Sequence, residues 1–171
     1  DHEKNVINLQ NKDIKNINVP AIPTQLWGST FKLKDHQENA YRKWIQQGGK
    51  GLLWHATGSG KTITSLYTLS SVMLGDEGST GQKCIAIIHV PFTPLADQWA
   101  DELSNFNLSP IKCYGSSRVW SSKLDYELAK FQQAETPFIL PLVVIDKTFF
   151  MDTFQKYLQK IQQNNLFYIC D

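Results

Sequence analysis

The chain has 171 residues and a mass of 19.5 kDa, which is enough for one ordinary domain with a sizeable buried core. Hydrophobic residues make up 42% and charged residues 19% of the sequence, a balance that excludes a disordered or collagen-like chain. The longest nearly unbroken apolar stretch, Phe138 to Ile145, has eight residues, far fewer than the roughly 18–20 that a membrane-spanning helix needs. With no secretory signal at its start, the chain is expected to be soluble and cytoplasmic, with no membrane partner.

The charge of the chain and its cysteines say little about the functional class of the protein. The net charge is +1, although residues 32–61 hold six Lys/Arg against two Asp/Glu; such a local excess is more often a solvated surface than a nucleic-acid site. The three cysteines, Cys84, Cys113 and Cys170, are scattered and form no C-x-x-C pair. We therefore expect buried, reduced thiols and neither a disulfide nor a zinc site.

Residues 1–30 are rich in Asn, Asp and Lys and contain Pro20 and Pro23, a composition that predicts a tail or linker before a domain at residues 31–171. In that domain, apolar runs alternate with segments of helical periodicity. The predicted strands are 51–55, 83–90, 111–114, 142–145 and 166–170, and the predicted helices are 34–47, 61–74, 93–106, 121–133 and 148–164. This order predicts an α/β fold whose parallel sheet has helices on both faces.

A phosphate-binding loop is predicted at residues 56–62, where the sequence reads A-T-G-S-G-K-T between a strand and a helix. Gly58 and Gly60 allow the tight turn that points several backbone N–H groups inward, and the N-terminus of the next helix adds to this cradle. Lys61 is expected to reach the β and γ phosphates of ATP, and the Thr62 hydroxyl to bind Mg²⁺. The predicted nucleotide-binding residues of the loop are Thr57, Gly58, Ser59, Gly60, Lys61 and Thr62.

The loop departs from the common G-x-x-x-x-G-K-[ST] pattern because His55 stands where the first glycine is expected. In this form A-T-G-S-G-K-T resembles superfamily 2 helicases and translocases. The Trp54-His55 pair before it is most similar to the restriction subunits of type I and type III restriction–modification systems and to related phage-defence motors. The resemblance implies a RecA-like P-loop NTPase domain.

The segment L-K-D-H-Q at residues 33–37 resembles the family's L-R-x-x-Q element and lies 24 residues ahead of Lys61, counted from Gln37. In relatives this glutamine reads the adenine ring through its carboxamide, which offers one donor and one acceptor. Gln37 is therefore a candidate adenine-binding residue. The alternative is an exposed glutamine at the start of a helix.

Three further segments resemble elements that contact nucleic acid in the family. The stretch H-V-P-F-T-P-L-A-D-Q-W at residues 89–99 resembles the element called motif Ia, which implies backbone contacts by Pro91 and Thr93. Looser matches imply contacts by Arg118 and Thr148, although Thr148 could instead cap the predicted helix 148–164. Plain packing is the alternative for motif Ia, with Leu95 and Trp99 as core residues.

The stretch L-F-Y-I-C-D at residues 166–171 resembles the strand that ends in the family's D-E-x-H box. The resemblance implies that Asp171 helps to hold Mg²⁺ beside the phosphate loop and contributes with Lys61 to catalysis. In relatives a glutamate that activates the attacking water comes next, and the following strand inserts between the strand of the phosphate loop and the strand of the box. We therefore expect that residues 31–171 are an incomplete motor domain, and that the 171 residues alone turn over negligible ATP.

Together the resemblance implies the N-terminal part of the first RecA-like domain of a helicase or translocase that hydrolyses ATP in the presence of nucleic acid. DNA is expected over RNA, and a second RecA-like domain of the same parent chain would supply arginines to the γ-phosphate. Two alternatives remain at this point. One is a P-loop ATPase with no nucleic-acid substrate, and the other is a non-catalytic nucleotide-binding module.

Overall fold

The sheet of this protein has four parallel strands in the order β4-β5-β3-β6. The computed structural model describes residues 17–75, 77–161 and 165–171. Its strands are β1 (Gln25–Leu26), β2 (Ser29–Thr30), β3 (Lys83–Val90), β4 (Ile111–Cys113), β5 (Phe138–Ile145) and β6 (Leu166–Cys170). Its helices are α2 (Asp35–Gln46), α3 (Lys61–Leu74), α4 (Thr93–Ser104), α5 (Ser117–Gln133), α6 (Asp146–Phe149) and α7 (Asp152–Lys160).

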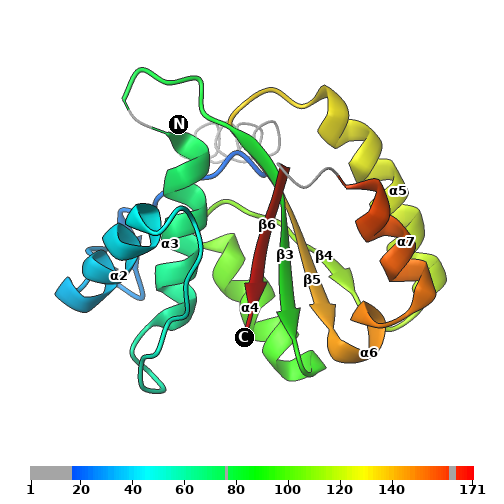
Figure 1. Cartoon of the computed structure of the whole chain (residues 1–171), viewed down its shortest axis with the longest axis horizontal. Coiled ribbons are helices and arrows are strands. Elements are labelled where there is room, and N and C mark those ends of the chain that lie inside the picture. The colour runs from blue at the N-terminus through cyan, green and yellow to red at the C-terminus, as the bar shows by residue number, and fades with distance from the viewer. Residues whose placement is uncertain (1–16, 76, 162–164) are drawn as a thin grey trace, which may run out of the picture.

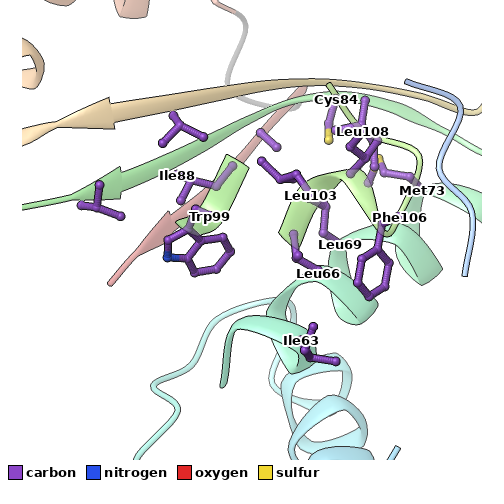
Figure 2. Close-up of a cluster of buried hydrophobic side chains, with 14 of the residues drawn as sticks. Ile63, Leu66, Leu69, Met73, Cys84, Ile88, Trp99, Leu103, Phe106 and Leu108 are labelled. Atoms are coloured by element: carbon purple, nitrogen blue, oxygen red, sulfur yellow. The ribbon is translucent and has the colours of Figure 1, made fainter. Parts of the chain in front are cut away.

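Helices cover both faces of the sheet, as the sequence predicts (Figure 1). Alternate residues of β3 enter two separate hydrophobic clusters because successive strand side chains point to opposite faces. Ala86 and Ile88 pack with α3 and α4 on one face (Figure 2). Ile85 and Ile87 pack with α5 and α7 on the other. The predicted α/β class, a parallel sheet with two helical layers, is therefore confirmed.

Lys83, at the start of β3, ties the sheet to the end of α5. Its Nζ donates to the carbonyl oxygens of Phe131, Gln132 and Ala134 at 3.0, 3.1 and 3.2 Å. The ammonium also lies 5.3 Å from the centre of the Phe131 ring. A cation at a helix C-terminus satisfies carbonyl groups that have no partner inside the helix and interacts favourably with the helix dipole.

Residues 17–30, which the sequence assigns to a tail, pack against the domain. The two-residue strands β1 and β2 form an antiparallel pair, and Leu26 is buried in the α3–α4 cluster. Backbone hydrogen bonds join Asn18 N to Asn107 O at 3.0 Å and Ile139 N to Asn18 O at 2.9 Å. Because these contacts come from residues distant in sequence, local composition could not indicate them. Residues 1–16 lie outside the described part.

The strand predicted at residues 51–55 is absent. The segment has no regular secondary structure and pairs with no described strand, and Leu52 and Trp54 are 79% and 87% exposed. An apolar run becomes a strand only when a neighbour takes its backbone hydrogen bonds. Among the described residues, β6 pairs only with β3, so its other edge is unpaired.

The prediction of a single helix at residues 148–164 is also wrong. It is divided into α6 and α7, with a break at Phe150 and Met151, and residues 162–164 lie outside the described part. The side-chain amide of Gln155 donates to the Phe149 carbonyl at 2.6 Å, which satisfies a carbonyl at the end of α6. Thr148 lies inside α6, which begins at Asp146, so it does not cap the helix.

Two other boundaries differ from the prediction. Helix α5 begins at Ser117, four residues before the predicted start at Ser121. Strand β5 begins at Phe138, four residues before the predicted start at Leu142, and therefore contains Pro141. Strand β4 pairs with β5 only from Leu142 onward, so Pro141 has no partner on that side. A proline, which lacks the backbone N–H, is tolerated where a strand has one open side. No helix in the described ranges is long and apolar enough to cross a membrane.

Candidate nucleotide-binding site

The loop at residues 56–60 leads directly into α3, whose first residue is Lys61. Gly58 and Gly60 have φ angles of +78° and +86°, a region that side chains rarely allow. Ser59 N donates to Ala56 O at 3.2 Å, which closes the turn. The two glycines therefore create the compact loop that the sequence predicts, with the N-terminus of α3 directly behind it.

The Lys61 side chain lies back over the start of the loop. Its Nζ donates to His55 O and Ala56 O, each at 3.2 Å. Both acceptors are neutral carbonyl groups, and no acidic partner holds the ammonium within the described part of the chain. A phosphate oxygen could therefore replace these carbonyl groups without breaking an ion pair.

Gln37 is buried against the loop, with 5% of its surface exposed. Its Oε1 accepts from Lys34 N at 2.9 Å, and its Nε2 donates to Gly60 O at 3.1 Å. A Cβ atom on Gly60 would lie 2.5 Å from Gln37 Nε2. Gln37 thus fixes the end of the loop relative to α2, which excludes the exposed-glutamine alternative; its contact with adenine stays a prediction.

Three polar side chains lie close together at the loop, and of these only Ser59 was among the predicted site residues. His36 Nε2 lies 3.0 Å from Ser59 O, and its ring meets the His55 ring edge-to-face at 5.2 Å. Within the described residues, the buried Ser59 Oγ and His55 Nδ1 atoms make no hydrogen bond. Burial without a partner is unfavourable for such groups. The only sequence signal for a role of His36 at the loop is its position next to Gln37.

Asp171 follows β6 and is held at two points. Its backbone N–H donates to His89 O at 3.0 Å, which continues the ladder between β3 and β6. Its Oδ2 accepts from Trp99 Nε1 at 2.9 Å. The loop before α3 and the end of β6 lie towards the same end of the sheet (Figure 1).

The oxygen donors of Thr62 and Asp171 fit a magnesium ion, which prefers hydroxyl, carboxylate and water ligands. Thr62 is the second residue of α3 and is half-buried. Within the described part, no hydrogen bond reaches the Thr62 hydroxyl or Asp171 Oδ1. The same ranges contain no cluster of three His, Cys, Asp or Glu residues that could hold a metal.

The candidate nucleic-acid residues occupy different environments. Pro91 is exposed, and Thr93 is the half-buried first residue of α4. Arg118 is exposed near the start of α5. Thr148 is 4% exposed in α6, so its side chain would need to be uncovered before it could reach a phosphate. The predicted packing role of Trp99 is confirmed, since it is 1% exposed.

Parallel strands whose carboxyl ends lie on the side of a glycine-rich loop, with that loop opening a helix, are the arrangement of a P-loop domain and fit a RecA-like fold. A family model described as "Type III restriction enzyme, res subunit" matches residues 30–171. The chain belongs to this family and is a helicase-like domain of the ATP-dependent motors of restriction systems. Comparison with curated proteins gives no significant match.

Proposed function

We propose that this chain is the ATP-binding part of a nucleic-acid-dependent motor that hydrolyses ATP and moves along DNA. The observation that carries the proposal is the loop at 56–60, whose two glycines have positive φ and which places Lys61 at the first position of α3. Backbone N–H groups and a helix N-terminus bind phosphates in this geometry. Membership of the restriction-subunit family supports the motor role.

Each residue of the site has a defined task in this proposal. Lys61 exchanges the carbonyl oxygens of His55 and Ala56 for oxygens of the β and γ phosphates. Gln37 holds the loop in shape through Gly60, and to contact the adenine its carboxamide would exchange its hydrogen bond with Lys34 N. Thr62 and Asp171 would hold Mg²⁺, which neutralises charge on the phosphate oxygens.

Nucleic acid is proposed to bind at the carboxyl edge of the sheet, where Thr93 opens α4 and Pro91 and Arg118 are exposed. A second RecA-like domain, carried by the same parent protein, is proposed to close over the nucleotide and supply arginines to the γ-phosphate. Closure and release in each hydrolysis cycle would then move the protein along its track. We propose a cytoplasmic location for this activity.

The nucleotide site is tested by measuring the affinity of the chain for a fluorescent ATP analogue in the presence of Mg²⁺. Lys61→Ala removes the ammonium and should weaken binding by at least about tenfold, because a charge-assisted hydrogen bond contributes about 1.5–3 kcal/mol. Lys50→Ala, at an exposed lysine before the loop, is the control and should bind normally. Equal affinities for both variants would reject the loop as the phosphate site.

Nucleic-acid dependence is tested separately in the parent protein that contains the second domain. ATP hydrolysis should rise when duplex DNA is added and fall to background in the Lys61→Ala variant. A rate that is indifferent to DNA and RNA would favour a P-loop ATPase without a nucleic-acid substrate.

A further inference from the structure

Trp99 makes one contact that packing does not require. It is 1% exposed, lies in the α3–α4 cluster of hydrophobic residues, and is labelled in Figure 2. Its ring fills space as any large apolar side chain would. Its only polar atom, Nε1, donates to Oδ2 of Asp171 at 2.9 Å, across 72 positions of sequence.

The second buried tryptophan makes no comparable contact. Trp120 is 2% exposed and lies in the α5–α7 cluster. Its Nε1 is buried and makes no hydrogen bond with any described residue. This fold therefore buries an indole N–H without a partner on one face of the sheet, whereas on the other face the N–H points at a carboxylate.

The contact also determines how the carboxylate can be used. Trp99 occupies Oδ2, and the backbone N–H of Asp171 is bound to His89 O. The first contact limits rotation of the carboxylate, the second holds the backbone that carries it, and Oδ1 is left as the oxygen for a ligand. Hydrogen bonds to charged acceptors are stronger than neutral ones, and groups that orient a metal-binding carboxylate raise metal affinity.

We propose that Trp99 is a positioning residue, whose indole N–H orients the Asp171 carboxylate so that Oδ1 faces the magnesium ion of bound ATP. The inference rests on the proposed nucleotide site and adds to it a residue of α4. It also gives the buried tryptophan a role that its place in the hydrophobic cluster would not indicate.

The first test compares Trp99→Phe with Trp120→Phe, each of which keeps an aromatic ring and removes the indole N–H. A fluorescent ATP analogue is titrated into each variant with Mg²⁺ and again with EDTA. Trp99→Phe should bind about tenfold more weakly than the unmodified chain in Mg²⁺, the lower end of the range for residues that orient metal ligands, and equally well in EDTA. Trp120→Phe should match the unmodified chain in both buffers.

The second test needs no variant of Trp99 and detects the hydrogen bond by NMR. The Trp99 indole N–H resonance should lie downfield of that of Trp120, and Asp171→Ala should shift the Trp99 resonance upfield while leaving the Trp120 resonance in place. Mn²⁺ added with the ATP analogue should broaden the Trp99 resonance more than that of Trp120.

The outcomes separate this inference from the proposed function. The positioning role would be overturned, while the nucleotide site stands, if Trp99→Phe lost affinity equally in Mg²⁺ and EDTA or lost none in either. It would also be overturned if Asp171→Ala left the Trp99 resonance unshifted. No binding of the analogue by the unmodified chain in either buffer would overturn both. If Trp99→Phe does not fold, the two NMR measurements decide.

Discussion

Replacing Gly60 with alanine should be the most damaging single-methyl change in the phosphate loop. The alanine would have to adopt φ near +86°, which costs about 1–2 kcal/mol for a residue with a side chain. Its Cβ would also lie 2.5 Å from Gln37 Nε2. Gln37 belongs to α2 and its side chain is buried against the loop, so making room for the methyl group displaces an amide that forms two hydrogen bonds, each worth about 0.5–1.5 kcal/mol.

The expected loss in the free energy of unfolding is therefore about 2–5 kcal/mol for Gly60→Ala. Gly58→Ala is the matched control, since Gly58 has φ of +78° and nothing lies within 4 Å of the added Cβ. It should lose only the backbone cost of about 1–2 kcal/mol. Urea unfolding followed by circular dichroism measures both losses.

A double variant tests the cause directly. Gln37→Ala removes the side chain that the new methyl group would clash with. Combining Gln37→Ala with Gly60→Ala should therefore lower the free energy of unfolding hardly further than Gly60→Ala alone. Contacting residues show such non-additive effects, whereas independent sites add. Equal losses for the two glycine variants, or simple addition in the double variant, would show that Gln37 does not constrain Gly60.

Two further predictions concern the rest of the fold. Lys83→Met keeps an unbranched side chain one atom shorter and removes the donor to three carbonyl groups at the end of α5. It should lower the free energy of unfolding by about 1–3 kcal/mol in a urea titration, whereas the exposed Lys156→Met should leave it unchanged. Burial raises the thiol pKa of both Cys84 and Cys113 to about 12, so both stay protonated at neutral pH, whereas Cys170 is exposed. A thiol reagent should therefore modify Cys170 alone in the native protein, and rapid reaction of a second thiol would contradict the described burial.

The elements that could be predicted from the sequence are those whose signals are local. Helix α3 and strand β3 have the predicted bounds, Lys61–Leu74 and Lys83–Val90, because apolar periodicity and flanking glycines determine both. The division between α6 and α7 has no such signal. It depends on Gln155, which reaches back to the Phe149 carbonyl, and on the Phe149 ring, which stacks on His89 at 4.1 Å.

The candidate site follows the same rule. The glycine loop and its lysine are contiguous, so their pattern identifies them. The contact between Gln37 and Gly60 spans 23 positions of sequence, and that between Trp99 and Asp171 spans 72. A glutamine or a tryptophan in the sequence does not indicate which distant residue it will contact. The strand predicted at 51–55 failed for the opposite reason, since its composition suits a strand but no described neighbour completes one.

The rung that joins Asp171 to His89 makes this carboxylate an extension of β3 and β6. Its position is therefore set by the backbone ladder of the sheet, whereas the position of Lys61 depends on the loop that opens α3 and on the contact of that loop with Gln37. Under the proposed function, the carboxyl end of the sheet would be the reference against which the lysine and the phosphates of a nucleotide are aligned.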